Sequence, residues 1–283
     1  MLAMTLLKIS RPGLWLVFIW LYLWPTGGRF GLLSSPKFWL GLLYCTFPLN
    51  LLVYGMNDLV DEDVDKNNPR KGNFIYGAIA TKSDLRKLPF QILCWNVAPL
   101  AFLSCLDSAH TGQYACWLLA SFVINFVYNN KPFQLSRCCP WELPTMILGH
   151  FLIPALSCQI NGVPLPSAAS WMYHSLLLSR SHIWLEFADI EVDSREGKRT
   201  IAVFLGPKWS LALVLLLTFS EAVVSFSLLN SWVLAGFSLF GILVFWNGST
   251  GAKVKKQKTL VSVSQTLVGA VLMGYLWYQG VFS

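Results

Sequence analysis

The chain has 283 residues, of which 55% are hydrophobic and only 12% are charged, and its mean hydropathy is +0.53. A soluble domain carries about a quarter charged residues, so this composition excludes an ordinary soluble protein and predicts a membrane protein. The net charge of +7 does not require nucleic acid as a partner, because a basic cytoplasmic face, anionic lipid and anionic substrates account for it.

Apolar stretches long enough to cross a membrane recur along the chain. A helix needs roughly 17 to 25 apolar residues to cross the hydrocarbon core. Nine stretches qualify, at about residues 12–28, 38–56, 88–106, 113–131, 142–160, 167–187, 209–227, 232–248 and 260–280. The sequence therefore predicts an all-α integral membrane protein with nine transmembrane helices.

Basic residues are distributed unequally between the connecting segments. Lys and Arg concentrate on the cytoplasmic side of membrane proteins. If the N-terminus is cytoplasmic, only Arg29 and Lys37 of the 21 basic residues fall on the opposite side. This asymmetry predicts a cytoplasmic N-terminus, and it predicts that the two long acidic loops, 57–87 and 188–208, lie on that same side.

Carboxylates gather at two corresponding places, after the second and around the end of the sixth stretch. Asp58, Asp61 and Asp65 are three and four residues apart, so they share one face if the chain stays helical past Gly55. A second set repeats at four, three and four residues: His182, Glu186, Asp189 and Asp193. The pattern predicts two stacks of acidic side chains.

Acidic side chains at this spacing repel one another and weaken a helix, so we expect cations between them. The first set contains no His or Cys, which favours a hard ion with a preference for oxygen, such as Mg²⁺. Mg²⁺ is usually held by one or two carboxylates together with substrate phosphates. The two sets therefore predict a diphosphate bridged by Mg²⁺. The alternative is that both sets are solvated helix ends.

The residues around both sets resemble the UbiA superfamily of intramembrane prenyltransferases. "NDLVDEDVD" (57–65) matches its NDxxDxxxD motif, and "DIEVDSREGKRTIAVFLG" (189–206) resembles its second DxxxD motif. "YNNK" (128–131) is similar to its YxxxK-type segment, one residue shorter. The resemblance implies a single domain, 1–283, in which nine helices surround a central cavity that opens sideways to lipid and is capped by the acidic loops.

The resemblance also implies a reaction: a prenyl diphosphate bound through Mg²⁺ ionises, and its allylic cation attacks a lipophilic acceptor. The implied metal ligands are Asp58, Asp61, Asp65, Asp189 and Asp193. The implied diphosphate-binding residues are Asn57, Arg70, Lys71, Lys131, Lys198 and Arg199. The implied catalytic residues are Asp61, Asp189, Lys131, Tyr128, His182 and Glu186. Aromatic faces for the cation would come from Tyr44, Tyr54, Phe126, Tyr128 and Trp184.

Ionisable residues inside a predicted span are costly and usually face a cavity. His182 and Glu186 could position the acceptor or take the proton that is lost after the cation attacks. They could equally form a hydrogen bond that locks helix packing. Glu221 is a further carboxylate in a predicted span, and the sequence suggests no partner for it.

The segments "NNPRKGNFIYGAI" (67–79) and "SRPGLW" (10–15) resemble the lycopene elongase branch of the superfamily more than members that act on aromatic acids. The acceptor could be an aromatic compound, a quinone precursor or a polyene. Two other hypotheses stay open at this point. One is a terpene cyclase of the UbiA type, which closes the cation on its own chain. The other is a non-catalytic scaffold or a transporter.

Overall fold

The structure is a computed structural model that describes residues 3–61, 71–248 and 269–282. These residues are largely helical, and the strand-like pairings among them are two isolated bridges, Asn73 with Gly77 and Cys138 with Arg199. The all-α prediction is confirmed. The contact pattern divides the chain into two compact units. The expectation that they form one domain stays a prediction.

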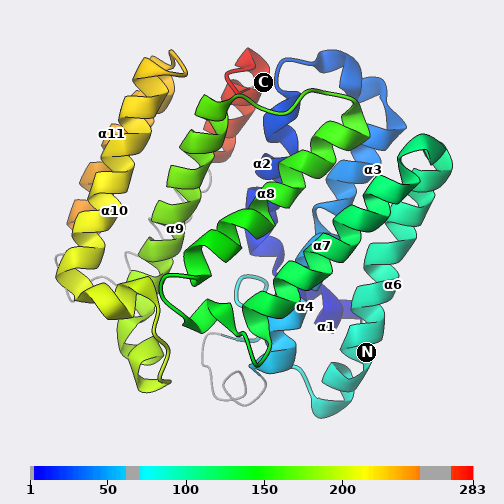
Figure 1. The fold of residues 1–283 in the computed structure, drawn as a ribbon, viewed down its shortest axis with the longest axis horizontal. Helices are drawn as coiled ribbons and strands as arrows, with labels where there is room; N and C mark the ends of the chain where they lie inside the picture. Colours follow the sequence, from blue (N-terminus) through cyan, green and yellow to red (C-terminus); the bar gives the residue numbers. More distant parts are fainter. Residues whose placement is uncertain (1–2, 62–70, 249–268, 283) are drawn as a thin grey trace. The chain divides into compact units, whose positions relative to one another are not determined.

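Unit 1 comprises Met1–Gln134 and Leu148–Leu165. Its helix α4 packs against α1, α3, α6 and α7, and α6 lies beside α7 (Figure 1). The elements of this unit are α1 (Ala3–Ile9), η1 (Pro12–Leu14), α2 (Trp15–Leu23), η2 (Trp24–Thr26), η3 (Phe30–Ser34), α3 (Pro36–Tyr44), α4 (Phe47–Val60), α6 (Lys82–Leu106), η4 (Ser108–His110), α7 (Thr111–Asn129) and most of α8 (Glu142–Asn161).

Unit 2 comprises Leu135–Ile147 and Pro166–Ser283. Its helix α10 packs against both α9 and α11. The elements of this unit are η5 (Leu135–Arg137), the first residues of α8, α9 (Ala168–Arg195), α10 (Ile201–Ser227), α11 (Trp232–Gly248) and a helix over residues 269–279.

Five segments of the described residues are long and apolar enough to cross a membrane. They are Ala3–Thr26, Pro36–Val60, Lys82–Leu106, Glu142–Asn161 and Ile201–Ser227. The predicted stretches 113–131 and 167–187 overlap α7 and α9, and 232–248 coincides with α11. The ninth, 260–280, is described only from residue 269, where it is helical. The pattern agrees with a multi-pass membrane protein.

The second predicted span is interrupted where α3 ends and α4 begins. Pro48 has no N–H to donate, and Thr46 lies outside the helical region at φ −86° and ψ −108°. The Asn50 side chain satisfies carbonyls at the break, since it donates to those of Cys45 at 2.9 Å and Thr46 at 2.7 Å. The buried Asn96 joins the start of α4 to α6, since it donates to the carbonyls of Pro48 at 3.0 Å and Ile92 at 2.9 Å. It also accepts from the Tyr44 hydroxyl at 2.9 Å. The first acidic motif therefore lies at the end of a helix that begins at Phe47 and is separate from α3.

Helix α4 continues through Gly55 to Val60, so the condition for a shared acidic face is met as far as Asp58, while Asp61 follows directly after the helix and Asp65 lies outside the described residues. A Cβ at Gly55 would lie 2.9 Å from the Ile92 side chain, so the glycine permits close approach of α4 and α6. This approach sets the position of Asn57 and Asp58, which lie one turn further along α4.

Helix α9 continues to Arg195, beyond its apolar stretch, so the second acidic set is helical throughout. Helix α10 starts at Ile201 and is broken at Gly206, where φ is +71°, next to Pro207. The Ser210 hydroxyl donates to the Ala202 carbonyl at 3.2 Å across this break. The residues between the second motif and the break thus form a separate short turn of helix.

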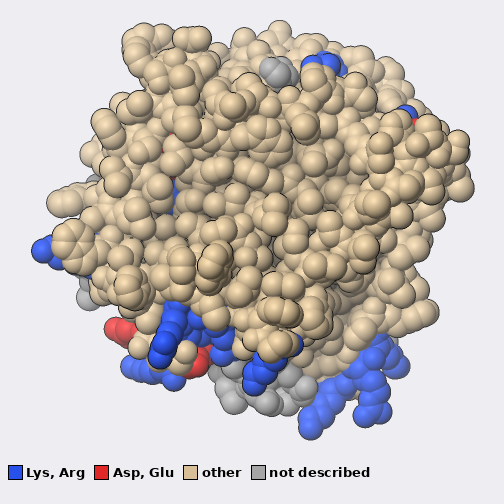
Figure 2. Space-filling model, in the orientation of Figure 1, with Lys and Arg blue, Asp and Glu red and all other residues tan. Residues whose placement is uncertain are grey.

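Charged side chains are distributed unevenly within each unit. In Figure 2 the visible Lys and Arg side chains gather at the helix ends that carry the acidic motifs, and the long helix faces show almost none. In unit 1 the start of α6 carries Lys82, Arg86 and Lys87. This agrees with the uneven loop charges in the sequence. The predicted cytoplasmic location of these ends stays a prediction.

The buried Tyr22 holds three helices of unit 1 together. Its hydroxyl donates to the Phe38 carbonyl of α3 at 2.9 Å and accepts from Asn161 of α8 at 3.0 Å. Its own carbonyl accepts from Ser157 of α8 at 2.6 Å. Gly41 makes this possible, because a Cβ there would overlap the Tyr22 hydroxyl.

We expect Gly41→Ala to lower the free energy of unfolding by about 1–3 kcal/mol, the usual cost of overpacking. Gly31→Ala is the matched control, because a Cβ at Gly31 meets no atom within 4 Å. Thermal unfolding in detergent, followed by tryptophan fluorescence, compares the two variants. Equal midpoints would show that the Tyr22–Gly41 contact does not limit the packing of unit 1.

Candidate active site

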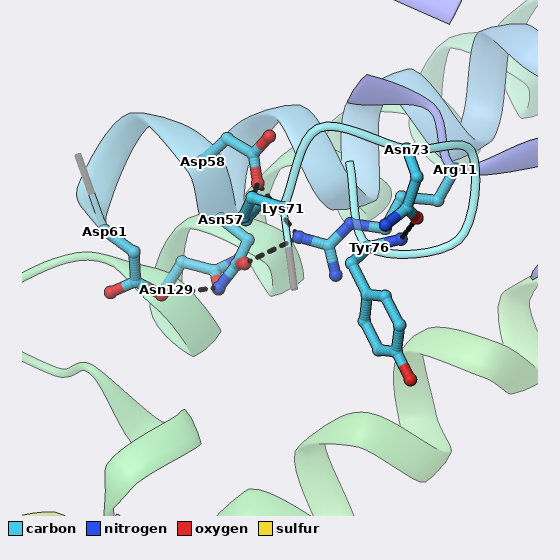
Figure 3. A network of polar contacts seen from close by, with 8 residues as sticks. All are labelled: Arg11, Asn57, Asp58, Asp61, Lys71, Asn73, Tyr76 and Asn129. Carbon is cyan, nitrogen blue, oxygen red and sulfur yellow. Dashed lines mark hydrogen bonds and ion pairs between the residues drawn. The ribbon is translucent and has the colours of Figure 1, made fainter. Parts of the chain in front are cut away.

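The last turn of α4 carries the first acidic motif (Figure 3). The Asn57 side-chain amide donates to the Asp61 carboxylate at 3.1 Å and to the side-chain oxygen Oδ1 of Asn129, at the end of α7, at 3.4 Å. Figure 3 shows Asp61 on the side of Asn57 that is opposite to Arg11. Asn57, Asp61 and Asn129 thus form one side of the site, in which the side-chain oxygens are those of carboxylates and amides.

Asp58 forms the other side of this site, together with two cations. Its Oδ1 accepts from Arg11 Nη2 at 2.9 Å and from Lys71 Nζ at 2.7 Å. Asp58 is only 2% exposed, and among the described residues its Oδ2 has no hydrogen-bond partner. Two cations against one carboxylate leave net positive charge here, which favours an anionic ligand.

Arg11 occupies an unusual backbone conformation directly before η1. It is left-handed, with φ +50° and ψ +67°, a region that costs a non-glycine residue about 1 kcal/mol or more. Its guanidinium lies 4.5 Å from the centre of the Tyr54 ring and 3.3 Å from Asn57 Oδ1. Its buried Nε has no hydrogen-bond partner among the described residues. Such strain is typical of functional sites.

The loop that follows the first motif holds Lys71 in place. The Gly72 N–H donates to the Gly77 carbonyl at 2.8 Å, and the Lys8 ammonium donates to the Gly72 carbonyl at 3.0 Å. The Asn73 side chain accepts from the N–H groups of residues 75 and 76, both at 2.9 Å. The Asn73 turn is visible beside Arg11 in Figure 3.

Gly77 faces the ionic cluster directly. Its φ is +93°, and a Cβ there would lie 3.3 Å from Arg11 Nε, 3.4 Å from Lys71 Nζ and 3.5 Å from Asp58 Oδ2. A side chain would therefore be strained by its backbone conformation and would crowd both cations. The loop closes over the cluster because this position is a glycine.

In unit 2 the second acidic set lies along the last turns of α9. His182 Nε2 lies 3.1 Å from a Glu186 oxygen, so these two side chains do meet. Asp193 is 8% exposed and accepts from Lys198 Nζ at 2.8 Å. Lys198 also pairs with Glu196 at 3.1 Å. Two carboxylates against one ammonium leave net negative charge, which favours a cation.

Burial and charge act in opposite directions on this pair. Burial raises the pKa of Asp193, although the hydrogen bond from Lys198 partly offsets the rise. Burial alone would lower the pKa of Lys198, but the bonds to Asp193 and Glu196 raise it instead. A cation next to Asp193 would compensate the cost of keeping its carboxylate ionised.

Two carboxylates bind the first N–H groups of α10. Glu142 Oε1 accepts from the Ile201 N–H at 2.6 Å, and Glu186 Oε2 accepts from the Ala202 N–H at 3.4 Å. Glu142 is fully buried. Glu186 thus lies 3.1 Å from His182 and accepts a bond from α10, whereas His182 Nε2 has no hydrogen-bond partner among the described residues. Both the packing role and the catalytic role of this pair stay predictions.

The remaining predicted residues have varied surroundings. Asp65 and Arg70 lie outside the described residues. Lys131 and Arg199 are exposed, and Tyr128 and Asp189 are half-buried. Among the candidate aromatic residues, Tyr44 is buried and bonded to Asn96, and Phe126 is 47% exposed.

Sequence reasoning missed several polar residues whose partners are distant in the chain. Arg11 and Asn129 contact the first motif across 47 and 72 residues. Glu221 pairs with Arg180, with an Nε–Oε1 distance of 2.5 Å, across 41 residues. The run "SRPGLW" pointed to the neighbourhood of Arg11, but nothing in it indicated an ionic contact with Asp58.

The donor atoms of both sets fit Mg²⁺. The first offers carboxylate and amide oxygens from Asn57, Asp58 and Asp61, including Asp58 Oδ2, which accepts no hydrogen bond from the described part of the chain. The second offers the carboxylates of Asp189 and Asp193. Oxygen donors of this kind are those that Mg²⁺ prefers. No group of three or more His, Cys, Asp or Glu side chains is arranged to hold a metal within the parts of the chain that the structure describes.

Comparison with known proteins agrees with this chemistry. Residues 14–267 match the model of the UbiA prenyltransferase family. The lycopene elongase/hydratase of Corynebacterium glutamicum is 29% identical over 220 residues, which cover 74% of each chain.

The fold is also that of solved structures. A UbiA homologue from Archaeoglobus fulgidus bound to GPP and Mg²⁺ superimposes with a TM-score of 0.73, at 19% identity over 98% of each chain. The same homologue bound to DMAPP and Mg²⁺ gives a TM-score of 0.73, at 18% identity over 98% of this chain and 97% of the other. The chain therefore belongs to the UbiA prenyltransferase family, and it is a membrane prenyltransferase.

Proposed function

We propose that this prenyltransferase ionises a prenyl diphosphate with the help of Mg²⁺ and transfers the prenyl group to a polyene acceptor. The observation that carries the proposal is the ionic cluster of unit 1. There a buried carboxylate holds Arg11 and Lys71 together, next to the oxygen donors Asn57 and Asp61. The last turn of α4 and the residues next to it therefore provide both basic groups that could bind a diphosphate and oxygen atoms that could bind a metal ion.

Asn57, Asp58 and Asp61 would hold a metal ion in unit 1, with Asp65 as a further ligand from the sequence. Asp189 and Asp193 would hold an ion in unit 2. Bound Mg²⁺ would supply positive charge to the oxygens of the leaving diphosphate. The relatives bound to GPP or DMAPP together with Mg²⁺ support this assignment.

The basic side chains would bind the diphosphate itself. The buried Arg11 Nε–H has no hydrogen-bond partner among the residues that the structure describes, and the Lys71 ammonium is held by Asp58. Lys131, Lys198, Arg199 and Arg70 are further candidates. When the C–O bond at C1 of the donor breaks, negative charge grows on the diphosphate oxygens. Donors that are already in place stabilise this charge without reorganising, which lowers the barrier.

The prenyl cation then forms a bond to a carbon of an acceptor double bond, and the resulting cation loses a proton. His182 and Glu186 are the candidates to accept this proton, and Tyr128 is a candidate to face the first cation. Tyr54 lies beneath Arg11, so its ring already faces one cation. A polyene acceptor is favoured because the named relative is a lycopene elongase/hydratase.

We expect purified protein in detergent to release diphosphate from GPP or DMAPP only when Mg²⁺ is present. Asp61→Asn and Asp193→Asn should each reduce turnover on the order of a hundredfold, the usual loss when a transition-state contact is removed. Asp107→Asn is the control, because Asp107 pairs with Lys37 and His110, outside the proposed site. Full activity in both site variants would refute the metal assignment.

Arg11→Ala should raise the KM for the donor roughly tenfold or more, since it removes a charged hydrogen bond to the diphosphate. Lys37→Ala is the control variant, because it also removes a basic side chain that is paired with an aspartate of unit 1, Asp107, outside the proposed site. Steady-state kinetics with GPP compares the two. An unchanged KM for Arg11→Ala would exclude Arg11 from the diphosphate site.

The acceptor is tested with lycopene and with an aromatic acid, each supplied with DMAPP in lipid vesicles. We expect a product heavier than lycopene by one five-carbon unit, identified by mass spectrometry, and no product from the aromatic acid. A prenylated aromatic product would show that the acceptor is aromatic and would refute the polyene proposal. A cyclic hydrocarbon from GPP without any acceptor would identify the protein as a terpene cyclase.

A further inference from the structure

The turn between α9 and α10, residues 196–200, presents two basic side chains from a tightly held backbone. We call it the basic turn. The N–H groups of residues 196, 197 and 198 donate to the carbonyls of Val192, Ser194 and Asp193, at 3.0, 3.1 and 3.0 Å. The C-terminal end of α9 thus fixes the first half of the turn, and Lys198 and Arg199 follow directly.

The second half of the basic turn is held from a different part of the chain. The Arg199 N–H donates to the Arg137 carbonyl at 3.0 Å, and the Cys139 N–H donates to the Arg199 carbonyl at 2.6 Å. Arg199 is therefore paired on both sides, although its side chain is exposed. The segment that makes these bonds leads directly into Glu142, the first residue of α8.

Glu142 contacts the residue that directly follows the basic turn, Ile201. Its Oε1 accepts from the Ile201 N–H at 2.6 Å, whereas its Oε2 has no hydrogen-bond partner among the described residues. Burying a carboxylate completely is costly unless the protein provides compensation. The Ile201 N–H, which has no partner within its own helix, and the positive dipole end of α10 provide it. This bond acts together with the Thr200 side chain, which accepts from the Val203 N–H at 3.4 Å, to fix the start of α10.

The geometry assigns Glu142 as a positioning residue for the basic turn. By binding the Ile201 N–H, it helps to fix the start of α10 and with it the backbone of Lys198, whose ammonium is held by Asp193 and Glu196, and of Arg199, whose side chain is exposed. The assignment deepens the proposed function and rests on it, because the ligand of these two side chains would be the donor diphosphate. Glu142 would act through the turn and would not touch the substrate.

The role requires an acceptor oxygen more than a charge. Glu142→Gln keeps an oxygen where Oε1 lies, so we expect it to retain the bond to Ile201. Glu142→Asp is one methylene shorter and should weaken the bond, and Glu142→Ala removes it. Glu191→Ala is the control, since Glu191 is an exposed carboxylate of the same unit.

Hydrogen exchange of the peptide that contains residues 201 and 202 tests the contact without reference to activity. We expect exchange there to quicken roughly tenfold or more in Glu142→Ala, because the amide loses its partner. It should quicken less in Glu142→Asp and stay close to the parent in Glu142→Gln and Glu191→Ala. If Glu142→Ala cannot be purified folded, the Asp and Gln variants decide the same point. Unchanged exchange in Asp and Ala variants would overturn the assignment.

Steady-state kinetics with GPP tests the consequence for binding. The KM for the donor should rise roughly tenfold in Glu142→Ala, while kcat changes much less, and Glu142→Gln should restore the parent KM. A fall in kcat alone would overturn the positioning role. If the parent itself releases no diphosphate, the proposed function fails, while hydrogen exchange still decides whether Glu142 holds the turn.

Discussion

The charges that this chain buries are partnered, and their partners determine where its helices meet. Removing a carboxylate or an ammonium from water costs several kcal/mol even after relaxation. Asp58, Asp193 and Glu221 are 2%, 8% and 1% exposed, and each accepts a hydrogen bond from Lys or Arg. Glu142 instead takes a backbone N–H at the start of α10. Helix ends and ionic groups are therefore positioned by the same contacts.

The two units balance their charges in opposite ways. In unit 1 one carboxylate, Asp58, holds two cations, and the excess is positive. In unit 2 one ammonium, Lys198, faces two carboxylates, and the excess is negative. The two acidic motifs are therefore not equivalent in the cations that surround them.

Much of this arrangement was predictable from local patterns. Apolar runs identified the helices, and 232–248 coincides with α11 from end to end. The spacing of the second acidic set at four, three and four residues is that of one helical face, and α9 carries the whole set, whereas α4 passes Gly55 but ends at Val60, before Asp61. Such features depend on neighbours within one or two turns, which a sequence displays directly.

Other features could not be predicted, because they arise only once helices have packed. Pro48 was visible in the sequence, but its carbonyl is satisfied by Asn96, 48 residues away. The partner of Glu221 is 41 residues distant, and that of Asp58 on the N-terminal side is 47 residues distant. No periodic pattern links such positions. The roles of Asp65 and Arg70 rest on the sequence alone.

The left-handed backbone of Arg11 has a consequence for how this protein can change. Glycine and asparagine adopt this conformation at lower cost than arginine, by about 1–2 kcal/mol. Either replacement would also remove one of the two cations from the buried Asp58, and breaking a buried ion pair costs about 3–5 kcal/mol. The ion pair with Asp58 therefore outweighs the backbone strain, so stability alone is a reason for this position to keep its arginine.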